Sequence, residues 1–182
     1  MKMNKWAKIL AAVLLVVMAL SLSACGGEKS ADLTPYDVGD FTIGVPKNWV
    51  AVPTTFDNVS EPGMITVAKG TENATEAIGK PTVVICYYKE GKKIDLEATK
   101  ESLEASGDID EKLIKDLAGF EWTGFRCPSV VYDYEMLLGR VPGEENICLE
   151  VTIQASDGFG EKALSIEDKD VRAIVDSIVP NA

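Results

Sequence analysis

The chain has no histidine among its 182 residues. Histidine is the commonest general base near neutral pH, so its absence excludes the serine and cysteine triads built on it. The sequence also contains no phosphate-binding glycine loop, Gly-x-Ser-x-Gly elbow or Ser-x-x-Lys motif. We therefore expect a protein that is not an enzyme and carries no cofactor. An enzyme would have to work with carboxylates, tyrosine or lysine.

Basic side chains are also scarce, with 18 Lys and Arg against 29 Asp and Glu and a net charge of −11. Nucleic acids and anionic lipid headgroups are recognised through Lys and Arg. The charge therefore excludes nucleic acid as a partner and keeps the chain soluble.

The first residues nevertheless concentrate positive charge. Lys2, Lys5 and Lys8 stand there without an acid, and the unbroken apolar run Ile9–Leu20 follows. A basic segment followed by a short apolar run is typical of a secretory signal. The run is shorter than the about 20 apolar residues that a membrane-spanning helix needs. The pattern favours an exported protein over one with a transmembrane anchor.

The segment Leu22-Ser23-Ala24-Cys25 resembles the lipobox of bacterial lipoproteins, in which the cysteine is acylated and becomes the first residue. This predicts a signal peptide over residues 1–24 and lipid attachment at Cys25. Two acyl chains hold a protein stably on a membrane, whereas one does not. We expect localisation at the cell membrane, lipid-anchored on the extracytoplasmic face. The alternative is an ordinary signal peptide, with Cys25 an incidental thiol.

Residues 25–40 are rich in Gly, Ser, Asp and Pro and lack a period, which predicts a flexible tether spanning on the order of 20 Å. Residues 41–182 show no internal repeat and no second composition, so we expect a single domain. It holds Cys86, Cys127 and Cys148, of which at most one pair can form a disulfide. Alternatively, all three are buried and reduced. A zinc site is not expected, because the chain has no histidine and no closely spaced pair of thiols.

Alternating or β-branched apolar residues predict a series of strands, and 3.6-residue periods predict two helices. A strand or a helix fits 109–117, where we favour a strand. In the predicted strand Ile147–Gln154, Cys148 falls on the more polar face, away from the main core. Ser165 and Asp168 are a candidate capping pair for the last helix. The order implies an α+β domain, a mostly antiparallel sheet with helices packed on it. The predicted strands are Phe41–Val45, Trp49–Val52, Met64–Ala68, Thr82–Tyr88, the region Glu121–Leu137 and Ile147–Gln154; the predicted helices are Ile94–Ser106 and the stripe of Val171, Ile174, Val175, Ile178 and Val179.

Several landmarks then resemble the PsbP-like superfamily of α/β/α sandwich domains. They are Phe41-Thr42-Ile43, Pro46 and Trp49 at Pro-x-x-Trp spacing, Thr123-Gly124, and the helix ending Ile174–Ile178. The resemblance covers most of residues 40–180. It implies a domain that serves in binding or assembly, and it transfers no site.

Candidate ligand-binding groups are few. The acidic clusters Asp108/Asp110/Glu111 and Glu167/Asp168/Asp170 lack a calcium-loop spacing, and the second suits a helix start, so we predict no metal site. Phe159 in the loop Asp157–Glu161, Trp49 and Trp122 could each line a recognition surface, but packing into the core is favoured for all three. The sequence thus predicts a non-enzymatic binding or assembly module with a protein partner at the cell surface. The alternatives are a small-ligand or cation-binding accessory lipoprotein and, less favoured, a carboxylate-based hydrolase.

Overall fold

The structure is a computed structural model that describes residues 32–53, 63–71, 76–77, 80–105, 110–112, 117, 119–127, 133–154 and 164–181. These residues belong to one unit, Ala31–Ala182. Cys25, the signal peptide, the first part of the tether, Asp108 and the loop Asp157–Glu161 lie outside the described residues.

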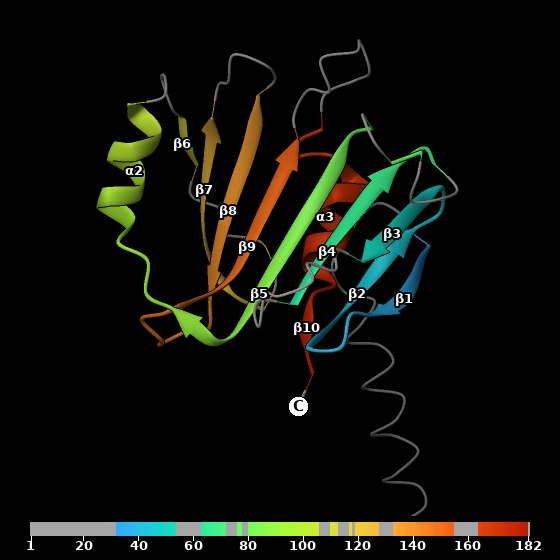
Figure 1. The fold of residues 1–182 in the computed structure, drawn as a ribbon, viewed down its shortest axis with the longest axis horizontal. Helices are drawn as coiled ribbons and strands as arrows, with labels where there is room; N and C mark the ends of the chain where they lie inside the picture. The colour runs from blue at the N-terminus through green and yellow to red at the C-terminus, as the bar shows by residue number, and fades with distance from the viewer. Residues whose placement is uncertain are drawn as a thin grey trace, which may run out of the picture. The chain divides into compact units, whose positions relative to one another are not determined.

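A seven-stranded antiparallel sheet forms most of the domain (Figure 1). Residues Ile65, Ile85, Val151 and Leu137 lie opposite one another on successive strands, so the apolar positions form a row on one face. The strand order is β3 (Trp49–Pro53), β4 (Gly63–Lys69), β5 (Thr82–Lys92), β9 (Ile147–Gln154), β8 (Tyr134–Arg140), β7 (Glu121–Cys127) and β6 (Asp110–Lys112).

A second, three-stranded sheet has the order β1 (Leu33–Asp37), β2 (Phe41–Pro46) and β10 (Val179–Pro180). The Asn181 side chain joins the two ends of the domain, because it donates to Asp37 Oδ1 and Gly39 O and accepts from Thr42 Oγ1. The prediction of a flexible tether up to residue 40 is therefore wrong for β1. The residues of β1 pair with β2, and Tyr36 packs against the core.

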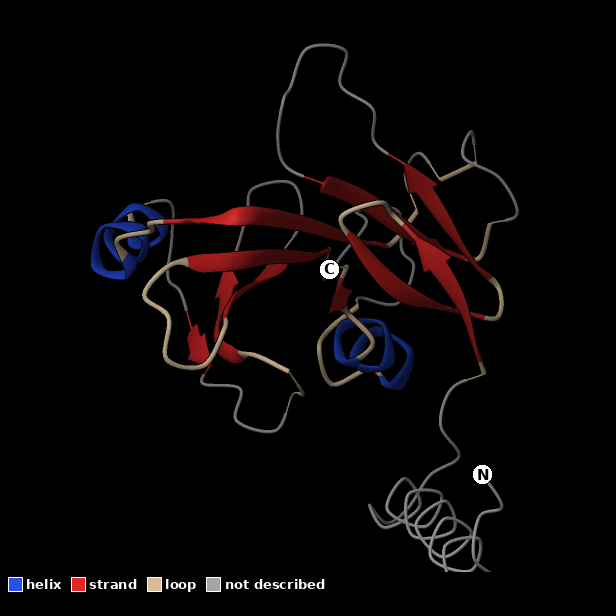
Figure 2. Ribbon diagram, turned by 90° about the horizontal axis from the view of Figure 1, so that it is seen from below, coloured by secondary structure: helices blue, strands red, loops and turns tan. Residues whose placement is uncertain are grey.

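The two described helices contact apolar clusters on opposite faces of the large sheet, α3 with three buried residues and α2 with none. Helix α3 (Lys169–Asp176) buries Val171, Ile174 and Val175 in the main core, which also holds the inward residues of β2, β4, β5 and β9. Helix α2 (Leu96–Glu104) packs on the other face, against a small cluster of Phe125, Cys127, Leu138 and Ile147. Figure 2 shows the two helices well apart. The α+β class, a mostly antiparallel sheet with helices on it, is confirmed.

Most predicted elements are confirmed, with shifts at their ends. The ambiguous segment 109–117 contains the short strand β6. The predicted strand region Glu121–Leu137 contains β7 and the beginning of β8, which pair antiparallel. The last helix ends at Asp176, and Val179, predicted to belong to its apolar stripe, is 58% exposed and pairs with Thr42 in β10.

The placement of Cys148 away from the main core is wrong. Cys148 is buried and belongs to the main core cluster. The pairing shifts here, since Leu149 lies opposite Gly139 while Ile147 lies opposite Arg140, so Cys148 is the extra residue of a β-bulge. A bulge interrupts the alternation of side chains on which the prediction depended.

Candidate binding site

A tight turn connects the two sheets and lies at one end of the candidate site. Strand β2 ends at Pro46, and Lys47 and Asn48 lead into β3 of the large sheet. Asn48 has a φ of 67°, a left-handed conformation that Asn adopts more readily than most residues. Its carbonyl accepts from Gly70 N at 2.9 Å, which fixes the turn to the end of β4.

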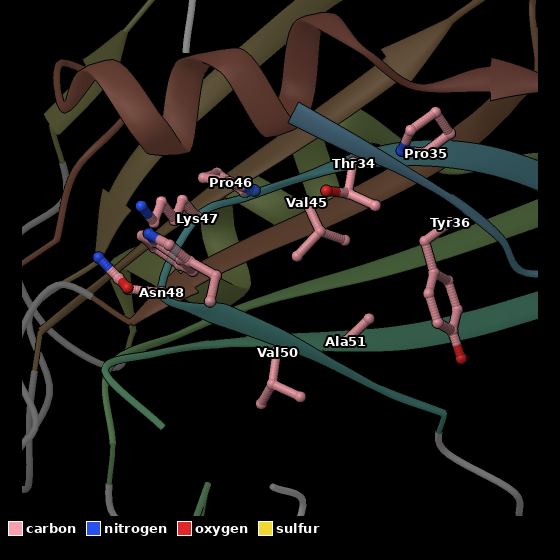
Figure 3. A pocket seen from close by; sticks show the side chains of 10 residues that line it. Thr34, Pro35, Tyr36, Val45, Pro46, Lys47, Asn48, Val50 and Ala51 are labelled. Carbon is pink, nitrogen blue, oxygen red and sulfur yellow. The ribbon is translucent and has the colours of Figure 1, made fainter. Parts of the chain in front are cut away.

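The groove between β1 and β3 has a volume of about 360 Å³. Small-molecule sites generally begin at about 300 Å³. Figure 3 shows the Tyr36 ring reaching from β1 toward β3, where Ala51 lies. The lining consists of Thr34, Pro35 and Tyr36 from β1, Val45 and Pro46 from β2, the turn residues Lys47 and Asn48, and Trp49, Val50 and Ala51 from β3.

Trp49 lines the groove and is also a core residue, 8% exposed. Its indole Nε1 donates to Asp170 Oδ2 at 3.2 Å, and the Lys69 ammonium lies 5.7 Å from its ring centroid. An ammonium at this distance is attracted to the ring face. The prediction that Trp49 packs in the core is confirmed, and the groove borders that same packed side chain.

The lining is apolar at one end and polar at the other. Tyr36 is half-buried against the core, and Pro35 and Ala51 lie near it. Lys47 is exposed and is the one charged side chain among the described lining residues. In a chain of net charge −11, this places a local positive charge at the turn end of the groove.

The groove runs along the edge of β3 and not over one face of the sheet. Successive side chains of a strand point to opposite faces. Val50 and Ala51 nevertheless both line the groove, as do the consecutive residues of β1. Within the described part of the chain, β3 pairs only with β4, and β1 only with β2.

Residues of the second acidic cluster, Glu167/Asp168/Asp170, make hydrogen bonds to other parts of the fold. Asp168 Oδ2 accepts from Ser165 N at 2.9 Å and Ser165 Oγ accepts from Glu167 N at 3.0 Å, in the turn before α3. The N-cap of α3 is Asp168 and its side chain caps no helix N–H, so the prediction that Ser165 and Asp168 cap the helix is wrong. Asp170 is bound to Trp49. Asp110 and Glu111 lie in β6. The described residues contain no group of three or more His, Cys, Asp or Glu placed to hold a metal.

The three described cysteines form no disulfide. Burial raises the pKa of the Cys86 thiol to about 11, and the nearby Glu150 carboxylate adds to the rise. Burial also raises the pKa of Cys127 and that of Cys148. Reactive thiols have a lowered pKa, so these three resemble structural cysteines.

Glu135 is a buried carboxylate whose role the sequence pattern did not indicate. Its side chain is 2% exposed; Oε1 accepts from Arg126 Nη2 at 2.8 Å and Oε2 from Ile166 N at 2.7 Å. Its alternation with Tyr134 and Met136 places it on the face that the main core occupies. The carboxylate therefore fastens β8 to the segment that enters α3.

No family model matches the chain, and no curated protein matches it. Among solved structures, it is similar to PsbP (CyanoP) from Synechocystis sp. PCC 6803, with 17% identity over 88% of this chain and 99% of that one, and a TM-score of 0.41. It is also similar to a Bacteroides thetaiotaomicron VPI-5482 protein, with 14% identity over 85% of this chain and a TM-score of 0.41. The chain spans about half (50%) of that protein's length. Among the described residues, none of the helices has the length and hydropathy to cross a bilayer.

Proposed function

We propose that this protein is a lipoprotein, anchored through Cys25 on the extracytoplasmic face of the cell membrane, whose domain is a non-enzymatic binding module. The observation that carries the binding role is the β1–β3 groove, with its apolar lining and the positive charge of Lys47 at one end. The anchor rests on the lipobox-like residues. Residues 26–32 separate Cys25 from β1, so the anchor would hold the groove close to the membrane surface.

The architecture fits a PsbP-like α/β/α sandwich, the finer fold that we propose. Support comes from α3 and α2 packing on opposite faces of the large sheet. Support also comes from Pro46 and Trp49, which lie on either side of the turn at the groove.

A binding role is favoured over catalysis by the composition of the groove. Carboxylate-based glycosidases need two acids facing each other across a cleft. The described lining residues include no Asp or Glu. The polar groups that remain, on Thr34, Tyr36, Lys47 and Asn48, suit recognition.

A photocrosslinking amino acid at Lys47 tests the groove as the site where a partner binds in the native cells. The matched control is the same amino acid at Glu144, an exposed turn position between β8 and β9. We expect one recurrent protein adduct from position 47 and none from position 144. Equal labelling from both positions, or none from position 47, would contradict a protein partner in the groove.

A small ligand is the second candidate, because the groove volume and its two aromatic side chains also fit one. Thermal-shift screening of the full chain against small organic anions tests this candidate. A stabilisation that disappears in Tyr36→Asp would favour it.

The anchor has a separate test. Replacing Cys25 by Ala removes the acylated sulfur, so we expect the protein to leave the membrane fraction. Retention of the Cys25→Ala protein in the membrane fraction would contradict lipid anchoring.

A further inference from the structure

We propose that the groove takes an extended peptide, which adds as a strand to the outer edge of β3 and places an acidic group beside Lys47. This inference rests on the proposed function, because it names the kind of ligand that the groove would bind. It is carried by the main-chain geometry of β3, the composition of β1 and the charge of the lining.

The main chain of Ala51 points away from the large sheet. In an antiparallel pair, opposite residues alternately exchange two main-chain hydrogen bonds or none. Lys69 N donates to Pro81 O, on the side of β5, so Lys69 and its opposite residue Trp49 exchange none. Two residues further along, Ala51 has the same orientation as Trp49. Its N–H and C=O therefore face outward, along the groove.

The position of Pro53 agrees with this alternation. Pro53 lies opposite Ile65 and has no N–H to donate. Because it is two residues beyond Ala51, its nitrogen also faces outward and the ladder to β4 loses nothing. The outer edge of β3 thus offers a donor and an acceptor at Ala51 and ends at Pro53, which limits an added strand to a few residues.

The facing edge of β1 is a poorer template. Gly44 N donates to Ser177 Oγ at 2.7 Å, on the side of β10, so Gly44 and its opposite residue Pro35 exchange no main-chain bond. The main chain of Pro35 then faces outward, where it lacks a donor. Proline on an edge strand blocks the addition of another strand. Of the two edges that flank the groove, only β3 presents both a donor and an acceptor in the middle of the lining.

The charge of the lining residues indicates the composition of the peptide that would bind. Lys47 is the one charged side chain among the described lining residues, and the chain as a whole carries 11 more acidic than basic groups. Trp49, Val50 and Ala51 make the rest of the β3 wall apolar or small. An acidic side chain or a terminal carboxylate at the turn end, followed by apolar residues, complements this arrangement.

The experiment selects random eight-residue peptides, displayed on phage, on the full-length lipidated protein in detergent micelles. The strongest binders are synthesised and methylated at one backbone nitrogen at a time. We expect methylation at alternate residues to weaken binding about tenfold, because each methyl removes a hydrogen bond to β3, and methylation between them to have little effect. The selected peptides should be acidic, and Lys47→Glu should weaken them more than Lys93→Glu, an exposed lysine beyond β5.

A matched pair of variants tests the edge itself. Ala51→Pro removes the outward N–H and spares the ladder to β4, whereas Ala51→Val keeps the N–H and changes only the side chain. We expect Ala51→Pro to weaken peptide binding about tenfold and Ala51→Val to retain it. The methylation pattern is measured on the unaltered protein, so it remains decisive even if Ala51→Pro folds poorly.

The possible outcomes distinguish a failure of the peptide inference from a failure of the groove as a binding site. Peptides whose binding is lost in Tyr36→Asp but shows no alternation on methylation would overturn strand addition and leave the groove as a binding site. A selection that yields no peptide, together with stabilisation by small organic anions, would overturn the peptide and favour a small ligand. Failure of both probes would overturn the proposed function as well.

Discussion

The two faces of the large sheet are built very differently. The face toward α3 carries the main core, in which Ile65, Val83, Ile85, Leu149, Val151 and Ile153 are fully buried. On the other face, the cluster beneath α2 is small, and Val84, Cys86, Glu150 and Thr152 are half-buried. Helix α2 has no buried residue, whereas α3 has three. The difference teaches that the fold depends on one face, and that changes on the other should be tolerated.

The largest expected effect comes from the packed helix. Ile174 is fully buried in α3, and truncating a buried isoleucine to alanine costs about 2 to 5 kcal/mol because a cavity remains. Leu103 of α2, which is half-buried, is the matched position on the other face. Chemical denaturation should show that Ile174→Ala lowers the free energy of unfolding far more than Leu103→Ala. Equal losses would remove the distinction between the faces.

A pair of glutamates on adjacent strands sharpens the comparison. Glu135 lies on the packed face and accepts from Arg126 and Ile166, whereas Glu150 lies on the other face and accepts from Tyr88. Glu135→Gln weakens three charge-assisted hydrogen bonds in a buried place, two from Arg126 and one from Ile166 N, so we expect a loss of about 1 to 3 kcal/mol. Glu150→Gln should change stability much less. Thermal unfolding of both variants checks this order, and the reverse order would contradict it.

Titratable groups on the less packed face should lower the stability of the fold at high pH. Burial raises the pKa of Cys86 from 9.0 to about 11, and burial together with Glu150 raises that of Tyr88 from 10.0 to about 12. Both groups are neutral when protonated, so folding favours the protonated forms. Their contribution to stability is complete below pH 9 and is lost as the pH rises through 11 to 12. Cys86→Val should therefore reduce the fall in melting temperature between pH 9 and pH 11, and an unchanged fall would contradict the role of this thiol.

The smallest expected effect concerns a polar atom on the packed face. Trp122 is 3% exposed, and its Nε1 is buried without a hydrogen-bond partner. Its ring packs against Gly139 and Phe120, contacts that a phenylalanine would largely keep. Because a buried unpaired donor costs about 1 to 3 kcal/mol, removing it offsets the loss of ring area. Trp122→Phe should leave the melting temperature nearly unchanged, while Trp122→Ala should lower it strongly.

Periodicity predicted the elements well wherever one face of a strand or helix is buried. The alternation in β9 and the stripe of Val171, Ile174 and Val175 are confirmed because burial imposes those patterns. The bulge at Cys148 and the end of α3 before Val179 depend on pairing with distant strands, which no local pattern records. β1 was missed because its polar and proline-containing residues match the composition of a tether.

The groove was harder to predict than the fold. The sequence indicated Trp49 as a core residue with a second possible role, and the core position is confirmed. No local pattern indicated that Tyr36 and Lys47 line a common site, since they become neighbours of Ala51 only when β1 pairs with β2 and the turn at Asn48 leads into β3 of the other sheet. The only sequence hint was the apolar content of Tyr36 and Val38 within a polar stretch.

The β1–β2 hairpin also determines how the domain would respond to mechanical load. Leu33, the first residue of β1, lies opposite Pro46 at the open end of the hairpin, while Asn181 clamps the turn end through Asp37 and Gly39. A pull on the chain before Leu33 would load the hydrogen bonds between β1 and β2 one after another, starting at the open end, and Thr34 and Tyr36 would detach before the clamp is reached. The β1 wall of the groove would thus yield before the clamped turn end of the hairpin.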